Sequence, residues 1–312
     1  MRVFLAGATG AVGQRLVALL VDAGHQVVGT TRTPGKVGGL RLAGANPVVL
    51  EGTDARAVRR AVLEARPEVV IHQMTALGGY FDLRRFAKTF ALTNRLRTEA
   101  TDHLAAAAVE AGARRFIAQS FTGWPNEQTG SSVKTEEDPL ISDPPEAVRD
   151  TVEAIRHLES VTTATPGIDG LVLRYGGFYG PGNALGKGGA LLEAVAARKV
   201  PIVGKGGGIN SFIHIDDAAA VSALAVERGE PGVYNIVDDE PAPASVWLPY
   251  LADVIGARPP RRVPVWLAKL VVGEPGVSMM TKIRGSSNVK AKRELGMTLK
   301  YPSWRQGFRE GL

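Results

Sequence analysis

The chain has 312 residues and no cysteine; 45% of its residues are hydrophobic, and its formal net charge at pH 7 is +6. This composition excludes a disordered chain, and the missing cysteines exclude disulfides, thiolate metal sites and cysteine catalysis. The basic residues are scattered among acidic ones, and no apolar run reaches the roughly 18 residues that span a bilayer. We therefore expect a cytoplasmic protein that binds a small molecule but no nucleic acid, membrane or metal ion.

The first motif is a strand-like run at residues 2–6, which ends in three evenly spaced glycines. Gly7, Gly10 and Gly13 are three residues apart, and apolar residues with helical spacing follow over 12–20. Glycine allows a tight turn and close approach of a ligand, and a helix N-terminus offers free N–H groups to a pyrophosphate. In this context the pattern predicts a nicotinamide dinucleotide site; the alternative is a tight turn that binds nothing.

Strand and helix patterns alternate through the first half of the chain. We expect further strands at 27–31, 48–50, 69–72, 115–119 and 170–174, with helices at about 54–66, 82–111 and 145–163. This alternation predicts a Rossmann-type, doubly wound parallel sheet. The segment 123–146, which is rich in Pro, Gly, Ser and acidic residues, is expected to be a long surface loop.

The pattern changes at residue 176, where glycine-rich turns begin. Short strands are expected at 200–203, 211–215 and 233–237, and two or three helices after residue 241. We predict a dinucleotide-binding domain over 1–175, whose sheet is completed by about 200–240. The segments 176–199 and 241–312 would form a small, mainly helical substrate lobe.

Later motifs carry a resemblance to a known family. They are Asp54 after the third strand, Asn94 with Thr98, Arg174-Tyr175, Tyr179-Gly180-Pro181-Gly182, the run 212–217 (FIHIDD) and the run 234–236 (YNI). With the glycines, they resemble those of extended short-chain dehydrogenases/reductases of the NAD-dependent epimerase/dehydratase type, over essentially the whole chain. The resemblance implies the fold predicted above and a nicotinamide cofactor. The expected cofactor contacts are Gly7, Thr9, Gly10, Ala11, Val12, Gly13, Thr31, Arg32, Lys36, Asp54, Met74, Thr75, Ala76, Asn94, Tyr175 and Phe178.

The end of the second strand bears on the choice of coenzyme. NAD-specific members of the family carry an acid there, which binds the ribose hydroxyls. This chain has Thr31 and Arg32 instead, with Lys36 close behind. A guanidinium can bind a 2′-phosphate in a bidentate manner. The sequence thus favours NADP(H), with NAD(H) possible; the alternative is that Arg32 is a solvated charge.

The family's Tyr-x-x-x-Lys pair is missing. The tyrosines are at positions 80, 175, 179, 234, 250 and 301, and none has Lys four residues later. Loss of a general acid typically costs about 10²–10⁴-fold in rate, less than reactant positioning can supply, so a reductase can survive it. The chain resembles an atypical subgroup that includes ketoreductases of natural-product biosynthesis. We expect Ser120 or Thr122 to bind the developing alkoxide, with water or a substrate hydroxyl as the proton source. Tyr80 could serve as a substitute acid or be a surface tyrosine.

Residues near the presumed pocket indicate the kind of substrate. Nucleotide-sugar enzymes of the family carry an Arg where this chain has Asn210, which cannot clamp a diphosphate. Trp124, Tyr179 and Phe212 lie in segments that line the pocket in the family, and they suggest an apolar or aromatic substrate; core packing is the alternative for Phe212 and for Phe178. For Trp266, Met279 and Met280 we favour helix packing over a role as a pocket lid.

These observations predict an NADPH-dependent reductase, specifically a ketoreductase, of an apolar or aromatic small molecule. One alternative is an NAD(P)-dependent epimerase or dehydratase of a sugar or nucleotide sugar. Another is a non-catalytic NADP-binding regulatory protein. A monomer or a homodimer would fit either class.

Overall fold

The computed structural model describes residues 1–77 and 85–312. Its centre is a seven-stranded sheet in the order β12-β7-β5-β4-β1-β2-β3, in which every pair of neighbours is parallel. This confirms the predicted Rossmann-type fold. The strands are β1 (Arg2–Ala6), β2 (Gln26–Thr31), β3 (Asn46–Val49), β4 (Val69–His72), β5 (Arg115–Phe121), β7 (Asp169–Tyr175) and β12 (Gly232–Ile236).

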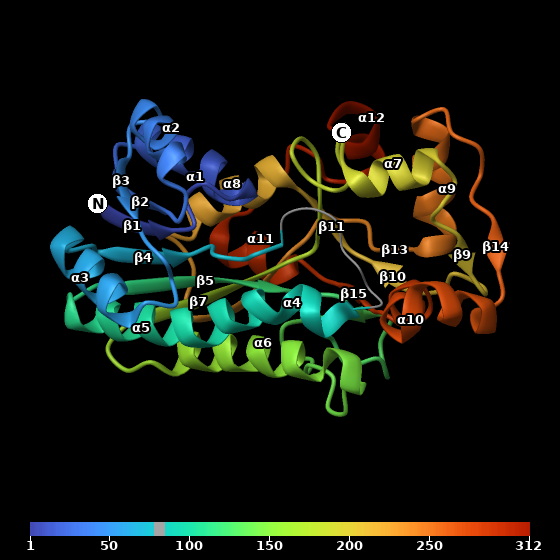
Figure 1. Cartoon of the computed structure of the whole chain (residues 1–312), viewed down its shortest axis with the longest axis horizontal. Coiled ribbons are helices and arrows are strands. Elements are labelled where there is room, and N and C mark those ends of the chain that lie inside the picture. The colour runs from blue at the N-terminus through green and yellow to red at the C-terminus, as the bar shows by residue number, and fades with distance from the viewer. Residues whose placement is uncertain (78–84) are drawn as a thin grey trace.

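Helices cover both faces of this sheet, which is why its central strands are almost uniformly apolar. One face packs against α1 (Ala11–Asp22), α8 (Ile215–Leu224) and α11 (Val289–Leu295). The other packs against α3 (Ala55–Ala65), α5 (Thr101–Glu110) and α6 (Glu146–Ala164). In Figure 1, α1 and α8 lie above β4, β5 and β7, and α5 and α6 lie below them. A short 3₁₀ turn at Pro34–Lys36 and α2 (Val37–Leu42) follow β2; the sequence analysis did not predict them.

The long helix expected over 82–111 is interrupted in its described part. It consists of α4 (Phe86–Arg95), a π-helical turn over Leu96–Ala100, and α5. A π-helical turn inserts one residue and frees backbone carbonyls for other partners. Here it also buries Arg97, which is 4% exposed.

The predicted loop over 123–146 is tied to the C-terminal part of the chain. It contains β6 (Val133–Lys134), which pairs in parallel with β15 (Gly285–Ser286). Inside the loop, the Ile141 amide donates to the Pro125 carbonyl. These bonds fix the segment that leads from β5 to α6.

Smaller elements surround the end of the sheet at the right of Figure 1. Three two-stranded pairs join β8 (Gly177–Tyr179) to β11 (Phe212–His214), β9 (Ile202–Val203) to β14 (Arg262–Val263), and β10 (Ile209–Asn210) to β13 (Ala242–Pro243). The helices are α7 (Ala190–Ala196), α9 (Ala244–Val254), α10 (Val265–Thr281) and α12 (Trp304–Glu310). Among the described residues, no helix combines the length and apolarity needed to cross a bilayer.

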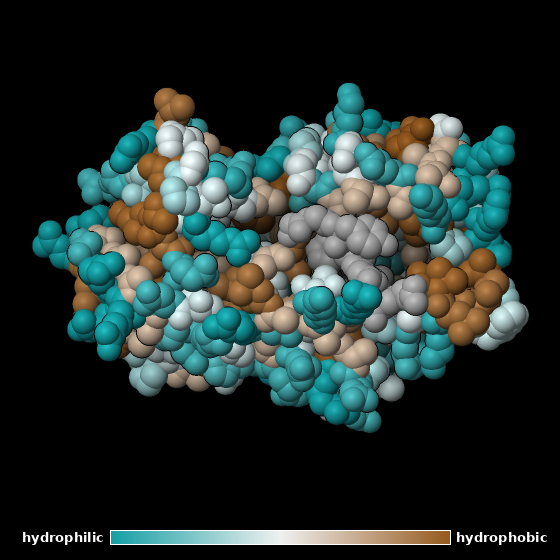
Figure 2. Space-filling model, in the orientation of Figure 1, coloured by the Kyte–Doolittle hydropathy of each residue, from teal (hydrophilic) through white to brown (hydrophobic). Residues whose placement is uncertain are grey.

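Helix α10 has two halves, because Gly273 adopts φ 71° and ψ 177°, outside the helical range. The first half exposes apolar side chains: Trp266 and Leu270 are each 69% exposed, and Val271 is 61% exposed. Figure 2 shows apolar surface at this end of the molecule. The helix packing favoured for Trp266 is therefore wrong, since its ring faces solvent.

Candidate dinucleotide and substrate site

The glycine turn between β1 and α1 is held by backbone geometry and by one side-chain hydroxyl of β2. Gly7 has φ 92°, and its amide donates to the Thr30 hydroxyl over 3.0 Å. The Gly10 amide donates to the Gly7 carbonyl, and α1 then begins with no side-chain cap and no acid in its first turn. The amides at this helix N-terminus therefore have no competing carboxylate, as binding of a pyrophosphate requires.

The end of β2 lies beside this turn. The Thr9 and Thr31 hydroxyls are 3.1 Å apart, and the Thr33 amide donates to the Thr31 hydroxyl. Arg32 and Lys36 are exposed, and within the described part of the chain neither forms an ion pair. Both cations are therefore available to an anionic group near the turn.

Asp54 begins α3 as its N-cap. Its carboxylate accepts a hydrogen bond from the Ala57 amide over 3.0 Å, and the side chain is exposed. Capping alone explains an Asp at this position. The expected contact between Asp54 and the cofactor stays a prediction.

The turn after β4 is held by a buried histidine. His72 Nδ1 accepts from the Met74 amide, and Nε2 lies 3.1 Å from the Leu96 carbonyl of the π-helical turn. Burial lowers the pKa of His72 to about 4, so the ring is neutral at pH 7 and Nε2–H donates to Leu96. Next along, the Ala76 amide donates to the Thr93 hydroxyl. The predicted cofactor segment Met74-Thr75-Ala76 is thus half-buried and anchored to helix α4.

Tyr175 ends β7 inside the sheet's core. Its phenol bonds with the Gln73 amide and the Ser222 hydroxyl, and burial raises its pKa to about 12. The Phe178 ring lies 5.2 Å from the Tyr175 ring and is only half-buried. A cofactor contact by either side chain stays a prediction.

Two of the predicted substrate residues lie in the core of the C-terminal elements. Tyr179 is 0% exposed and Phe212 is 4% exposed, and their rings pack edge to face with Phe308. For Phe212, these contacts favour a role in core packing over a role in substrate binding. Asn210 is half-buried on β10 and donates to the Gly208 carbonyl.

The hydroxyls of Ser120 and Thr122 have protein partners. Ser120 donates to Glu159 over 2.6 Å, and the same carboxylate accepts two hydrogen bonds from the Arg174 guanidinium. Thr122 bonds with Ser286. Both hydroxyls are at most 2% exposed, so a role for either on a substrate oxygen stays a prediction. Tyr80 lies outside the described residues.

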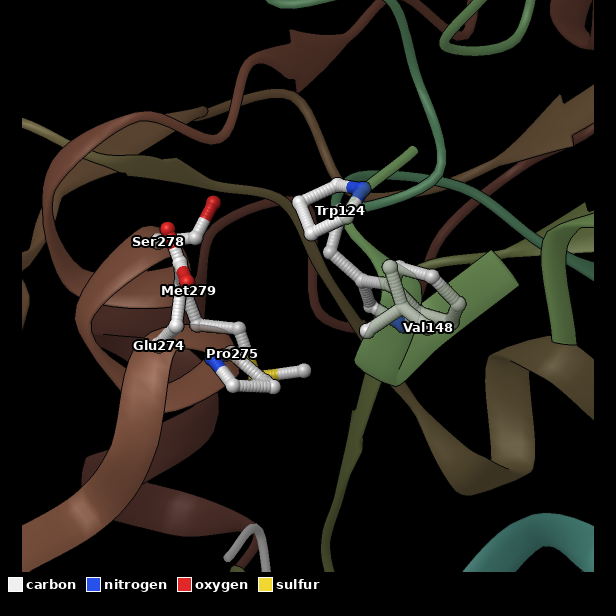
Figure 3. Close-up of a pocket in the computed structure, with 7 residues that line it drawn as sticks. Trp124, Val148, Glu274, Pro275, Ser278 and Met279 are labelled. Carbon is white, nitrogen blue, oxygen red and sulfur yellow. The ribbon is translucent and has the colours of Figure 1, made fainter. Parts of the chain in front are cut away.

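A mainly apolar hollow lies between α6 and the second half of α10. Figure 3 shows Trp124 and Val148 on one side and Glu274, Pro275, Ser278 and Met279 on the other; Pro145 completes the lining. The Trp124 ring meets the Phe86 ring edge to face at 5.4 Å. Sequence reasoning selected Trp124, but missed Pro145, Val148 and Pro275 and favoured helix packing for Met279. The apolar start of the predicted helix at 145–163 was the available signal.

The predicted cofactor residue Asn94 lies near this hollow. Its amide nitrogen donates to the Thr151 hydroxyl over 3.0 Å, while its Oδ1 is buried with no hydrogen-bond partner among the described residues. Thr151 is on α6, one turn after Val148. By the resemblance, α6 is the helix that would carry the family's Tyr-Lys pair, and, as the sequence analysis noted, residues 146–164 contain neither residue type.

A glycine turn at the carboxyl end of β1, opening directly onto a helix, defines the class as nicotinamide-dependent oxidoreductases of the Rossmann type. The sequence model of the NAD dependent epimerase/dehydratase family matches residues 3–237, and the chain belongs to this family. It is an NAD(P)-dependent oxidoreductase.

Similar proteins are known by sequence and by structure. A Streptomyces protein named 3-diazoavenalumate denitrifying reductase is 42% identical over 99% of both chains. UDP-glucose 4-epimerase of Thermotoga maritima, solved with UDP-glucose, superposes with a TM-score of 0.76 at 22% identity, covering 99% of this chain and 96% of that one. A human epimerase family protein, solved with NADPH, has a TM-score of 0.76 at 21% identity, covering 99% and 98%. The two structures support the fold.

Proposed function

We propose that this protein is an NADPH-dependent reductase of an aromatic small molecule, with an aryl diazo compound as the first substrate to test. The observation that carries the proposal is the full-length likeness to a reductase that is named for a diazo substrate. The exposed pair Arg32 and Lys36 supports NADPH over NADH, because both cations can bind a 2′-phosphate.

The residues of the hollow fit this class of substrate. Trp124 and Val148 face Pro275 and Met279 across a mainly apolar hollow. Aromatic side chains favour edge-to-face or offset contacts with an aromatic ligand. Glu274, the charged residue in the lining, would favour a cationic diazonium over an anionic sugar nucleotide.

The missing proton donor also fits. The cofactor supplies a hydride when bound. An aryl diazonium carbon that accepts this hydride loses its C–N bond, N₂ departs, and the arene is left with no proton needed. A ketone, in contrast, becomes an alkoxide that must be protonated, and helix α6 offers neither Tyr nor Lys for that step. The missing Tyr-Lys pair should therefore slow the reduction of a diazonium less than the reduction of a ketone.

Ketone reduction is the second candidate, since the predicted alkoxide ligands Ser120 and Thr122 lie at the end of β5. Their hydroxyls would have to leave Glu159 and Ser286 to act. Asn210 in place of an Arg speaks against a nucleotide sugar. The relationship to a reductase and to an enzyme family gives no support to the non-catalytic alternative.

The test is NADPH consumption with benzenediazonium, with acetophenone in parallel, and each repeated with NADH. NADPH deuterated at nicotinamide C4 should place deuterium in the benzene formed, with one N₂ released per NADPH oxidised. Heat-denatured protein controls for the spontaneous reaction. Reduction of acetophenone alone would favour the ketone reading, and turnover of neither compound would contradict the proposal.

A further inference from the structure

A polar pair of side chains lies on α4 and α6, one helical turn beyond residues of the hollow and its apolar cluster. On α4, Phe90 belongs to the apolar cluster with Val148 and Trp124, and Asn94 lies one helical turn further along. On α6, Thr151 likewise lies one turn beyond Val148. The hydrogen bond from Asn94 to Thr151 therefore joins the two helices just beyond the apolar walls.

This pair also adjoins the segment expected to hold the cofactor. Thr93, the residue before Asn94, accepts a hydrogen bond from the Ala76 amide over 3.0 Å. Asn94 and Thr151 thus lie between the turn after β4 and the hollow.

The two side chains have unused hydrogen-bonding capacity. Thr151 is 1% exposed, and its hydroxyl oxygen accepts from Asn94, which leaves the hydroxyl proton with no acceptor among residues 1–77 and 85–312. Asn94 Oδ1 is likewise buried with no partner in that part of the chain. Buried polar groups are paired in the great majority of cases, so an unused donor and an unused acceptor one helical turn beyond an apolar hollow indicate a ligand with oxygen atoms.

Other polar groups near this end of α6 are already used. Glu159 binds Arg174 and Ser120, and Thr162 lies three turns away. Among residues 146–158 of α6, Thr151 is the residue with a side-chain hydroxyl, and it is buried. It is therefore the group in this part of the helix that can donate to a substrate.

We infer that Thr151 is a substrate-binding residue that donates to a phenolic oxygen of a hydroxylated aromatic substrate, and that Asn94 positions the Thr151 hydroxyl for this bond. The inference rests on the proposed function, because it takes the hollow as the substrate site. It narrows the substrate class from aromatic to hydroxyaromatic.

The test measures binding, so that it does not depend on turnover. Titration calorimetry would compare 4-hydroxycinnamate with cinnamate on the NADPH-loaded protein; the carboxylate is common to both and cancels. We expect the hydroxylated ligand to bind about tenfold more tightly to the wild type. Thr151→Val should abolish this preference while leaving the affinity for cinnamate and for NADPH within twofold, and Thr151→Ser should keep it.

Thr162→Val is the matched control, because Thr162 is a buried threonine of the same helix whose hydroxyl has no partner within the described ranges. It should leave the preference unchanged. Three outcomes would each overturn the inference. The wild type could show no preference, the preference could survive Thr151→Val, or it could be lost in Thr162→Val. Diazonium turnover in the wild type would stand or fall separately and decides the proposed function.

Discussion

Gly13 packs directly on the Gly7 carbonyl: a Cβ atom on Gly13 would lie 2.2 Å from the Gly7 oxygen and 2.9 Å from the backbone of Ala8. Every contact in question is with backbone, so no side chain can move aside. A substitution must shift either the turn or helix α1. The turn and the helix that would hold the pyrophosphate are therefore one rigid unit.

Gly13→Ala is expected to weaken NADPH binding at least tenfold, because the added methyl group displaces the turn from the helix N-terminus. Fluorescence titration of NADPH would measure this. Gly38→Ala is the control, since a Cβ there meets nothing within 4 Å. Unchanged affinity in Gly13→Ala would show that the dinucleotide does not bind at this turn.

Arg32→Asp is expected to reduce NADPH affinity by tenfold or more and to leave NADH affinity nearly unchanged or improved. The carboxylate would repel a 2′-phosphate and could accept from the ribose hydroxyls instead. Calorimetry with both nucleotides measures the change in preference. Arg41→Asp, also exposed but on α2, controls for the change in net charge. An equal effect of the two variants would argue against a phosphate contact at Arg32.

Glu159→Gln should lower the free energy of unfolding by about 3–5 kcal/mol, because it leaves the buried Arg174 without its carboxylate. Both partners are almost fully buried, and the guanidinium bonds to the carboxylate over 2.6 and 2.8 Å. Glu153→Gln, which removes an exposed partner of Arg156, should cost less than about 1 kcal/mol. Urea denaturation of the two variants measures the difference. Similar losses of stability would contradict the view that Glu159 and Arg174 form a buried ion pair.

His72 should make the protein less stable in acid. Its folded-state pKa of about 4 lies below the ordinary value of 6.5, so the unfolded chain binds the proton more readily. Above pH 6.5 the ring is neutral in both states; as the pH falls from 6.5 to 4, stability is lost, by up to about 3 kcal/mol. Burial also lowers the pKa of His25 and His214, which act in the same direction.

His72→Gln keeps a donor for the Leu96 carbonyl but cannot take up a proton. Its loss of stability between pH 6.5 and 4.5, measured by urea denaturation, should be smaller than that of the wild type. The wild type at each pH is the reference, because carboxylates titrate in both proteins. Equal pH dependence would show that His72 is accessible to protons in the folded state.

The parts of the fold that depend on local pattern were predictable. The apolar run before Gly7 gave β1, and the amphipathic residues 145–163 correspond to α6 within one residue at each end. The π-helical turn at Leu96–Ala100 was not predictable, because its residues are ordinary helix formers. The Leu96 carbonyl in this turn bonds to His72, which lies 24 positions away in the sequence. The short strands β6 and β15 depend equally on distant pairing.

The candidate site also has a part that was predictable from the sequence and a part that was not. The dinucleotide turn is a local motif, so its residues could be named from the sequence. The partners of Ser120 and Asn94 come from α6, 39 and 57 positions further along. Nothing near either residue in the sequence indicates such a partner. The hollow needs both α6 and α10, which are more than 100 residues apart in the sequence, so neither segment alone could indicate it.

The break in α10 has a consequence for how such an enzyme can diversify. The wall of the hollow opposite Trp124 comes from residues 274–279, a short stretch after Gly273 that shares no residue with the glycine turn or the end of β2. Changes of side chain in that stretch alter the shape offered to a substrate and leave the dinucleotide turn intact. Under the proposed function, new substrates could therefore be acquired one residue at a time on α10, without an inactive intermediate that has lost its cofactor.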